Sequence, residues 1–139
     1  MRLTIEKVLF LNSVEMLADI PPEILAELAS ILTEVSVSAE DVVVKEGDIG
    51  TSMYIIIDGS ARVEVKGKTV ATLKSGQIFG ELAALSPEPR TATITALEDT
   101  QMFRLDQEAL HEFMRQYIEV AIGIINSLCG LLQKQITSK

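Results

Sequence analysis

The sequence predicts a mainly β fold, a barrel or sandwich of short strands with helices before and after it in the chain. Apolar residues recur at helical spacing near both ends of the chain, whereas between residues 34 and 105 the hydrophobic period falls to two. Short β-branched runs lie in that middle part, separated by turn residues. With 139 residues and 47% hydrophobic composition, the chain can bury one core, but two domains would each be too small to be stable. We therefore expect a single domain over residues 1–139.

The first part of the chain, residues 3–32, is predicted to form short helices. Its apolar side chains, such as Ile24, Leu28 and Leu32, recur at the spacing of one helix face. Pro22 follows Pro21 at a point where a helix can begin, because proline is favoured at the first helical position.

The middle part of the chain, residues 34–105, is predicted to form the β-barrel. Asp58 and Gly59 stand between two β-branched runs and form a hairpin signal, because glycine adopts the positive φ of a tight turn. Other glycines, among them Gly47, Gly67 and Gly76, mark further turns. The runs predicted as strands are residues 42–44, 53–57, 61–65, 70–73, 92–96 and 102–105.

The last part of the chain, residues 106–136, returns to helical spacing and is predicted to form two helices. Asp106 is a suitable N-cap for the first of them, with Glu108 in its first turn. The second helix has two apolar stripes, so that one can cover the barrel while the other stays exposed for a partner subunit or a larger parent protein; a wholly buried helix is the alternative. The stripes are Ala121, Ile125, Leu128 and Leu132 on one face and Val120, Ile124 and Leu131 on another.

Charge and residue usage exclude several classes of function. The 12 basic residues stand against 20 acidic ones, a net charge of −8, with no basic block that could neutralise a row of phosphates, so we expect no direct DNA binding. His111 is the only histidine and has no second ligand at metal-binding spacing, so we expect no metal. Cys129 cannot form an internal disulfide, and its apolar neighbours predict a buried, unreactive thiol.

The apolar segments predict the cellular location of the protein, because they match neither a signal peptide nor a membrane-spanning helix. The opening residues do not have the order of a signal peptide. The most apolar stretch, residues 120–132, is interrupted by Asn126 and Ser127 and is shorter than the roughly 18 residues of a membrane-spanning helix. We therefore expect a cytoplasmic protein without a membrane segment.

One segment, FGELAALSPEPRTATITA at residues 79–96, carries residue types suited to binding an anion. If residues 82–85 form a helical turn, its first N–H groups have no partners within the helix and are available to a phosphate oxygen, and Gly80 lets a ligand approach the backbone. Arg90 offers paired donors and a permanent positive charge, while the carboxylate of Glu81 suits a sugar hydroxyl and could also pair with Arg90. Pro87 restricts the intervening loop, which lowers the entropy lost on closing over a ligand. The pattern indicates recognition of a sugar joined to a phosphate.

This segment resembles the phosphate-binding cassette of the cyclic nucleotide-binding family, whose pattern is Phe-Gly-Glu-Leu-Ala followed by Arg, a small residue and Ala. The resemblance extends over nearly the whole chain and includes the stretch KEGDIGTSMYIIIDGSARVEV at residues 45–65. The chain is similar in organisation to the ligand domains of bacterial catabolite activators and protein kinase regulatory subunits. The resemblance implies a jelly-roll-like antiparallel β-barrel, a double-stranded β-helix, at residues 34–105, with a cassette at residues 79–92, short N-terminal helices and two C-terminal helices.

The resemblance also implies a ligand and roles for individual residues. The ligand would be cAMP, with cGMP as the alternative, because Thr91 is compatible with both. Glu81 would bind the ribose 2′-hydroxyl, Arg90 the cyclic phosphate, and the N–H groups of Leu82 and Ala83 the other phosphate oxygens. The implied ligand-binding residues are Phe79, Gly80, Glu81, Leu82, Ala83, Arg90, Thr91 and Ala92.

Beyond the cassette, the pattern leaves the base contact and the output open. Gln135 is the nearest candidate for a base contact, and no helix-turn-helix segment follows the barrel in this sequence. We expect a non-catalytic regulatory module, because no nucleophile with a base and no metal cluster can be found. Its signal would pass through the C-terminal helices to a homodimer partner or a larger parent protein. The alternatives are a structural salt bridge between Glu81 and Arg90, or a degenerate cassette in a nucleotide-independent interaction module.

Overall fold

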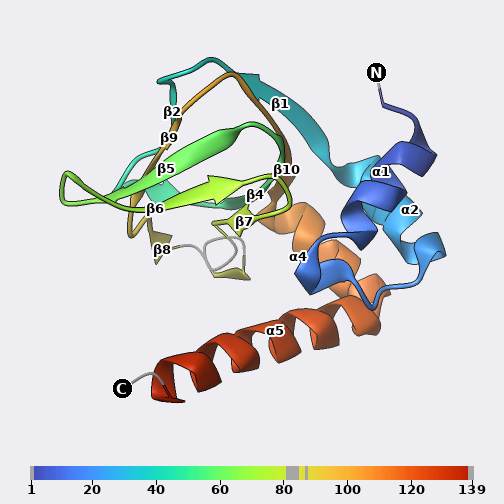
Figure 1. The fold of residues 1–139 in the computed structure, drawn as a ribbon. Coiled ribbons are helices and arrows are strands. Elements are labelled where there is room, and N and C mark those ends of the chain that lie inside the picture. Colours follow the sequence, from blue (N-terminus) through green and yellow to red (C-terminus); the bar gives the residue numbers. More distant parts are fainter. Residues whose placement is uncertain (1, 81–84, 87, 138–139) are drawn as a thin grey trace. The chain divides into compact units, whose positions relative to one another are not determined.

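The computed structural model describes residues 2–80, 85–86 and 88–137, and these form two compact units (Figure 1). The helical unit comprises Met1–Ser30 and His111–Lys139, and the barrel unit comprises Ile31–Leu110. The expected single domain over residues 1–139 stays a prediction.

The N-terminal segment forms short helices, as the sequence predicted. Pro22 is the first residue of its helix, because a proline ring presets the helical φ and lacks an N–H that would have no partner there. Two further helices follow the barrel. The helices are α1 (Thr4–Asn12), the 3₁₀ helix η1 (Glu15–Leu17), α2 (Pro22–Ile31), α4 (Gln107–Gln116) and α5 (Ile118–Thr137).

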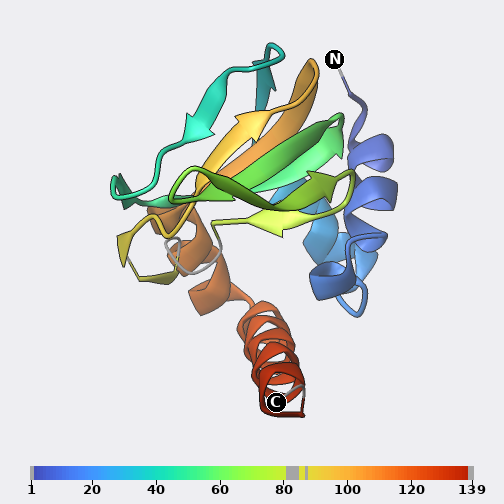
Figure 2. The same cartoon turned by 60° about the vertical axis from the view of Figure 1, so that its left-hand side comes forward.

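The barrel unit contains two four-stranded sheets, ordered β1-β10-β4-β7 and β2-β9-β5-β6, and a two-stranded sheet of β3 and β8 (Figure 1 and Figure 2). Every pairing recorded between the described strands is antiparallel. The strands are β1 (Thr33–Val37), β2 (Val42–Val44), β3 (Ile49–Gly50), β4 (Ser52–Asp58), β5 (Ser60–Val65), β6 (Lys68–Lys74), β7 (Ile78–Phe79), β8 (Glu88–Pro89), β9 (Thr93–Ala96) and β10 (Thr100–Asp106).

The core of the barrel unit lies between its two large sheets. Ile56 and Met102 on one sheet and Ala61 and Ile94 on the other belong to one buried cluster, which also includes Phe79. Phe79 stacks on Tyr54 of the neighbouring strand, with ring centroids 4.9 Å apart. The core therefore extends to β7, the strand that leads directly into the predicted cassette.

The hairpin predicted at Asp58 and Gly59 is wrong, because β4 and β5 belong to different sheets. Gly59 has φ +111°, and a Cβ atom there would lie 2.3 Å from Thr100 Oγ1, so this glycine allows a close approach where the chain crosses between sheets. The hairpin is one turn further on. Lys66 and Gly67 connect the paired strands β5 and β6 with φ values of +52° and +81°.

Two acidic residues between β9 and β10 accept hydrogen bonds from other parts of the barrel unit. Asp99 Oδ1 accepts from the N–H of Ala39 at 3.0 Å, and Glu98 Oε2 accepts from Ser60 Oγ at 2.7 Å. Asp106, the predicted N-cap, is the last residue of β10 and directly precedes α4. Its Oδ1 accepts from Ser52 Oγ at 2.6 Å, which links β10 to β4. Within the described residues, no helix has the length and apolarity needed to cross a membrane.

Helix α5 has a buried side and an exposed side. Val120 and Ile124, from one predicted stripe, are buried, and the helix lies against η1 within the helical unit. Leu131 of the same stripe is exposed. The prediction of a buried thiol at Cys129 is wrong, because this side chain is exposed. Cys129 follows Val120 by nine residues, about 2.5 turns at ~3.6 residues per turn, which places it on the opposite side of the helix.

Candidate functional site

Arg90 is fixed to the barrel unit by its backbone. Its N–H donates to the carbonyl of Asp48 at 2.7 Å, and its own carbonyl accepts from the N–H of Gly47 at 2.9 Å. The two residues before it form β8, which pairs with β3. The local sequence favours this arrangement, because Gly47 has φ +91° in the turn that brings β3 back toward β8.

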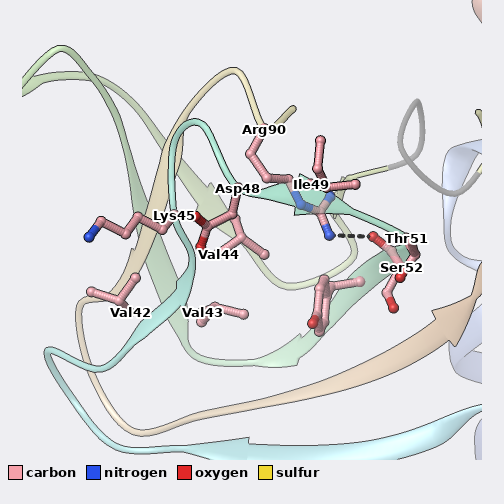
Figure 3. A pocket seen from close by; sticks show the side chains of 10 residues that line it. Val42, Val43, Val44, Lys45, Asp48, Ile49, Thr51, Ser52 and Arg90 are labelled. Carbon is pink, nitrogen blue, oxygen red and sulfur yellow. Dashed lines mark hydrogen bonds between the residues drawn. The ribbon is translucent and has the colours of Figure 1, made fainter. Parts of the chain in front are cut away.

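The two terminal nitrogens of the Arg90 guanidinium group, Nη1 and Nη2, differ in their hydrogen bonding. Nη2 donates to the carbonyl oxygen of Ser52 at 2.9 Å (Figure 3). Nη1 is buried and has no hydrogen-bond partner among the described residues. Buried polar atoms in proteins almost always have a partner, and a charged donor loses most when it lacks one. This nitrogen is therefore a donor available to an acceptor that the described residues do not supply.

Gly80 provides the space that Nη1 occupies. Its φ is +80°, and a Cβ atom at this position would lie 2.5 Å from Arg90 Nη1 and 2.7 Å from the carbonyl oxygen of Ser52. A side chain at residue 80 would therefore be strained by its backbone and would collide with the guanidinium group. The glycine predicted to admit a ligand thus also admits the arginine.

A cavity of about 220 Å³ lies beside these groups. Its apolar walls come from both large sheets, including Val44 and Ile94 of one and Ile78 of the other, and Arg90 supplies the positive charge. Five residues predicted to bind ligand line this cavity, namely Phe79, Gly80, Arg90, Thr91 and Ala92. A cavity lined by several apolar side chains and one cation suits a ligand that joins an apolar ring system to an anionic group.

Arg90 also lines a second cavity of about 370 Å³, which the sequence did not predict (Figure 3). Lys45, Asp48 and Ser52 contribute polar groups to it, and Val44 lines both cavities. The turn glycines of residues 45–65 were the only signal for this region, and they indicated turns rather than a chamber. Arg90 therefore contacts two cavities of the barrel unit.

The charges of Arg90 and Arg62 are compensated differently. Arg62 on β5 pairs with Glu64 and, at 2.8 Å, with Glu40. These carboxylates, Glu64 first, raise the pKa of Arg62 above its usual value. No described carboxylate forms a recorded ion pair with Arg90. Of these two arginines, Arg90 is the one whose charge is not compensated by a carboxylate of the described residues.

Several predicted site residues are not placed beside Arg90. Glu81, Leu82 and Ala83 lie outside the described residues, as do Ala84 and Pro87 of the same loop, so the predicted helical turn and the pairing of Glu81 with Arg90 stay predictions. Gln135 is exposed on α5, in the helical unit. His111 is half-buried in α4. The described residues contain no group of three or more His, Cys, Asp or Glu side chains arranged to hold a metal ion.

Comparison with known proteins identifies the family. The model of the cyclic nucleotide-binding domain matches residues 34–117. The chain is 36% identical to a cAMP-dependent protein kinase regulatory subunit of Yarrowia lipolytica over 107 residues, 76% of this chain and 28% of the relative. It is 33% identical to a cGMP-dependent protein kinase of Drosophila melanogaster over 88 residues, 63% of this chain and 8% of the relative. The aligned part thus covers well under a third of these curated relatives.

The fold agrees with this assignment. The structure is similar to the N-terminal domain of a transcriptional regulator from Streptomyces coelicolor A3(2), with a TM-score of 0.82 and 27% sequence identity over 96% of this chain and 95% of that one. The predicted mainly antiparallel, jelly-roll-like architecture with flanking helices is confirmed. Family model, relatives and fold agree, and the chain belongs to the cyclic nucleotide-binding domain family.

Proposed function

We propose that this chain is a non-catalytic regulatory module that binds cAMP, with cGMP as the weaker ligand, in the cavity beside Arg90. The observation that carries the proposal is the buried Nη1 of Arg90, which has no partner among the described residues and lies next to a cavity lined by five of the predicted ligand-binding residues. A cyclic phosphate would supply the missing acceptor, and guanidinium–phosphate hydrogen bonds are among the strong ones because both partners are charged.

The cavity walls support a nucleoside attached to that phosphate. Val63 and Leu73, from β5 and β6, line the cavity and offer apolar surface to a base or ribose. In the proposal, Glu81 accepts from the ribose 2′-hydroxyl, and the N–H groups of Leu82 and Ala83 donate to the phosphate. Since cAMP and cGMP carry the same ribose and phosphate, these contacts do not decide between the two bases.

The preference for cAMP rests on the share of the chain that the cAMP-dependent relative matches and on the resemblance to the ligand domains of bacterial catabolite activators. Of the two curated relatives described above, the cAMP-dependent regulatory subunit matches the larger share of the chain. Calorimetric titration of the whole chain with cAMP and with cGMP tests both parts of the proposal. We expect sub-millimolar binding of both, with cAMP tighter. Failure of both nucleotides to bind at 1 mM would overturn the proposal, and tighter binding of cGMP would overturn the preference.

We further propose that α4 and α5 carry the signal away from the barrel. Helix α4 continues directly from β10, so any shift of that strand on ligand binding is transmitted along the chain. Binding would then change the population of two helix arrangements. We expect cAMP to change hydrogen exchange over residues 107–137, and unchanged exchange in that segment at saturating cAMP would contradict this route.

A second candidate function, nucleotide-independent dimerisation, is favoured by the exposed side of α5. Its exposed residues recur at alternating spacings of four and three, the pattern of a two-helix coiled coil. Only Glu119 and Lys134 are charged between residues 118 and 136, so two copies would bring little like charge together despite the net charge of −8. The residues of this α5 seam are Ile118, Ile122, Ile125, Cys129, Leu132 and Ile136.

Light scattering with and without cAMP separates the two candidates. A dimer unaffected by cAMP, together with no nucleotide binding in the titration, would favour the second function over the first.

If the α5 seam forms the dimer, Ile125→Glu should give a monomer, because it places a charge in an apolar interface. Lys134→Glu is the control, since this exposed residue lies outside the seam. A monomeric wild-type chain, or a dimer that persists in Ile125→Glu, would exclude dimerisation through the seam.

A further inference from the structure

The guanidinium group of Arg90 packs against Gly50, a residue outside the predicted cassette. A Cβ atom at Gly50 would lie 2.1 Å from Arg90 Nε, 2.3 Å from Cζ and 2.7 Å from Cδ, whereas real Cβ atoms essentially never approach other heavy atoms within 3.0 Å. Three atoms of the arginine therefore occupy space that any other residue at position 50 would fill with its own side chain.

The backbone of Gly50 does not itself require glycine. The described glycines with positive φ are Gly47, Gly59, Gly67, Gly76 and Gly80, and Gly50 is not among them. Alanine could adopt its extended conformation in β3 without the strain of the left-handed region. The contact with Arg90 is therefore the physical reason for a glycine here.

Arg90 cannot move away from Gly50 as a whole, because the two backbones are tied together. Gly50 pairs with Glu88, and Ile49 pairs with Pro89, in the ladder between β3 and β8. The N–H of Arg90 also donates to the carbonyl of Asp48. A larger residue at position 50 would have to displace the side chain of Arg90, and with it the hydrogen bond from Nη2 to the Ser52 carbonyl.

We propose that Gly50 is a positioning residue for Arg90: with the Ser52 carbonyl, it holds the guanidinium group in place before ligand binds. The placement of Arg90 stands on the contacts above, and its consequence for affinity rests on the proposed function. Fixing a charged group in its binding position in advance strengthens binding, because less rotamer entropy is lost when the ligand arrives.

A double-mutant cycle on the nucleotide-free protein tests the placement. Thermal unfolding is measured for the wild-type chain, Gly50→Ala, Arg90→Ala and the double variant. We expect Gly50→Ala to lower the Tm by about 3–8 °C in the presence of Arg90 and to have little effect in the Arg90→Ala background, because the atoms it would meet are then gone.

The outcomes separate this inference from the proposed function. An unchanged Tm in Gly50→Ala, or an equal loss with and without the Arg90 side chain, would overturn the positioning role whether or not nucleotide binds. If the wild-type chain binds cAMP, we expect Gly50→Ala to weaken binding about tenfold or more, and unchanged affinity would also overturn the role. If the wild-type chain binds no nucleotide, the proposed function fails while the unfolding cycle still decides the placement.

Discussion

Arg90 and Gly80 show how two residues that are 10 positions apart in the sequence depend on each other in the site. Gly80 has a left-handed φ, and Nη1 of Arg90 lies where a Cβ atom of residue 80 would be. The missing side chain therefore leaves room for the arginine as well as for a ligand. Nearly the same φ occurs at Gly67, where no atom lies within 4 Å of an added Cβ. The two glycines thus share the backbone strain of substitution, and only Gly80 adds a collision.

This difference predicts the outcome of two alanine substitutions. Gly67→Ala should lower the free energy of unfolding by about 1–2 kcal/mol, the cost of a left-handed alanine. Gly80→Ala should cost at least ~1 kcal/mol more, because Arg90 Nη1 and the Ser52 carbonyl must also move. Urea unfolding of both variants measures the difference. Equal losses would mean that the contact between Gly80 and Arg90 contributes nothing to stability.

The sequence predicted Arg90 and Gly80 through the spacing of one short segment, but it could not predict their neighbours. The Ser52 carbonyl is a backbone atom, which no residue type reveals, and it lies 38 residues from the arginine that it binds. No prediction was made for Gly50, because a glycine required by a distant side chain looks the same in the sequence as one required by its own φ. The contact of Arg90 with Gly50 and Ser52 therefore needed the structure.

Among the elements, strands with several β-branched residues were predictable, and the very short ones were not. The six predicted runs correspond to β2, β4, β5, β6, β9 and β10. Strands β3, β7 and β8 have two residues each, too few to show an alternating pattern. The five-residue strand β1 was not among the predicted runs either. Strands β3 and β8 hold Gly50 beside Arg90, so the elements missed from sequence include those that fix the site.

Turn chemistry misled the prediction at Asp58 and Gly59, because an Asp-Gly pair indicates a tight turn but not which strands it joins. Those two residues lead from one sheet to the other, whereas Lys66 and Gly67 close the hairpin of β5 and β6. Lysine is a poor residue for the φ of +52° that this turn imposes on position 66.

The β5–β6 hairpin should therefore be open to stabilisation. Lys66→Asn should raise the free energy of unfolding by about 0.5–1 kcal/mol, because asparagine tolerates the left-handed region better than lysine does. The hydrogen bond from the backbone N–H of residue 66 to Glu46 Oε1 would be kept. Denaturant unfolding measures the change, with Lys68→Asn on the exposed start of β6 as the control. If Lys68→Asn raised the free energy of unfolding as much as Lys66→Asn, the gain would come from the loss of a lysine and not from the turn.

At the scale of the whole molecule, an acidic chain with net charge −8 presents a cation to a cavity of the barrel unit. The charge argued against a nucleic-acid partner from the sequence alone, and the family resemblance is confirmed over residues 34–117. The sequence predicted that one apolar stripe of α5 is exposed, but it could not show which stripe packs within the helical unit. Cys129 was predicted to be buried for the same reason, and it is exposed.

The central claim is that Nη1 of Arg90, which is buried without a partner among the described residues, binds the phosphate of a cyclic nucleotide. Calorimetric titration of Arg90→Ala with cAMP tests it most directly. Loss of the charged hydrogen bonds should cost about 2–4 kcal/mol, a weakening of roughly 30- to 1,000-fold. Arg62→Ala is the matched control, because that arginine is already paired with Glu64 and Glu40, and its affinity for cAMP should stay close to that of the wild-type chain. Wild-type affinity in Arg90→Ala, or an equal loss in Arg62→Ala, would contradict the claim.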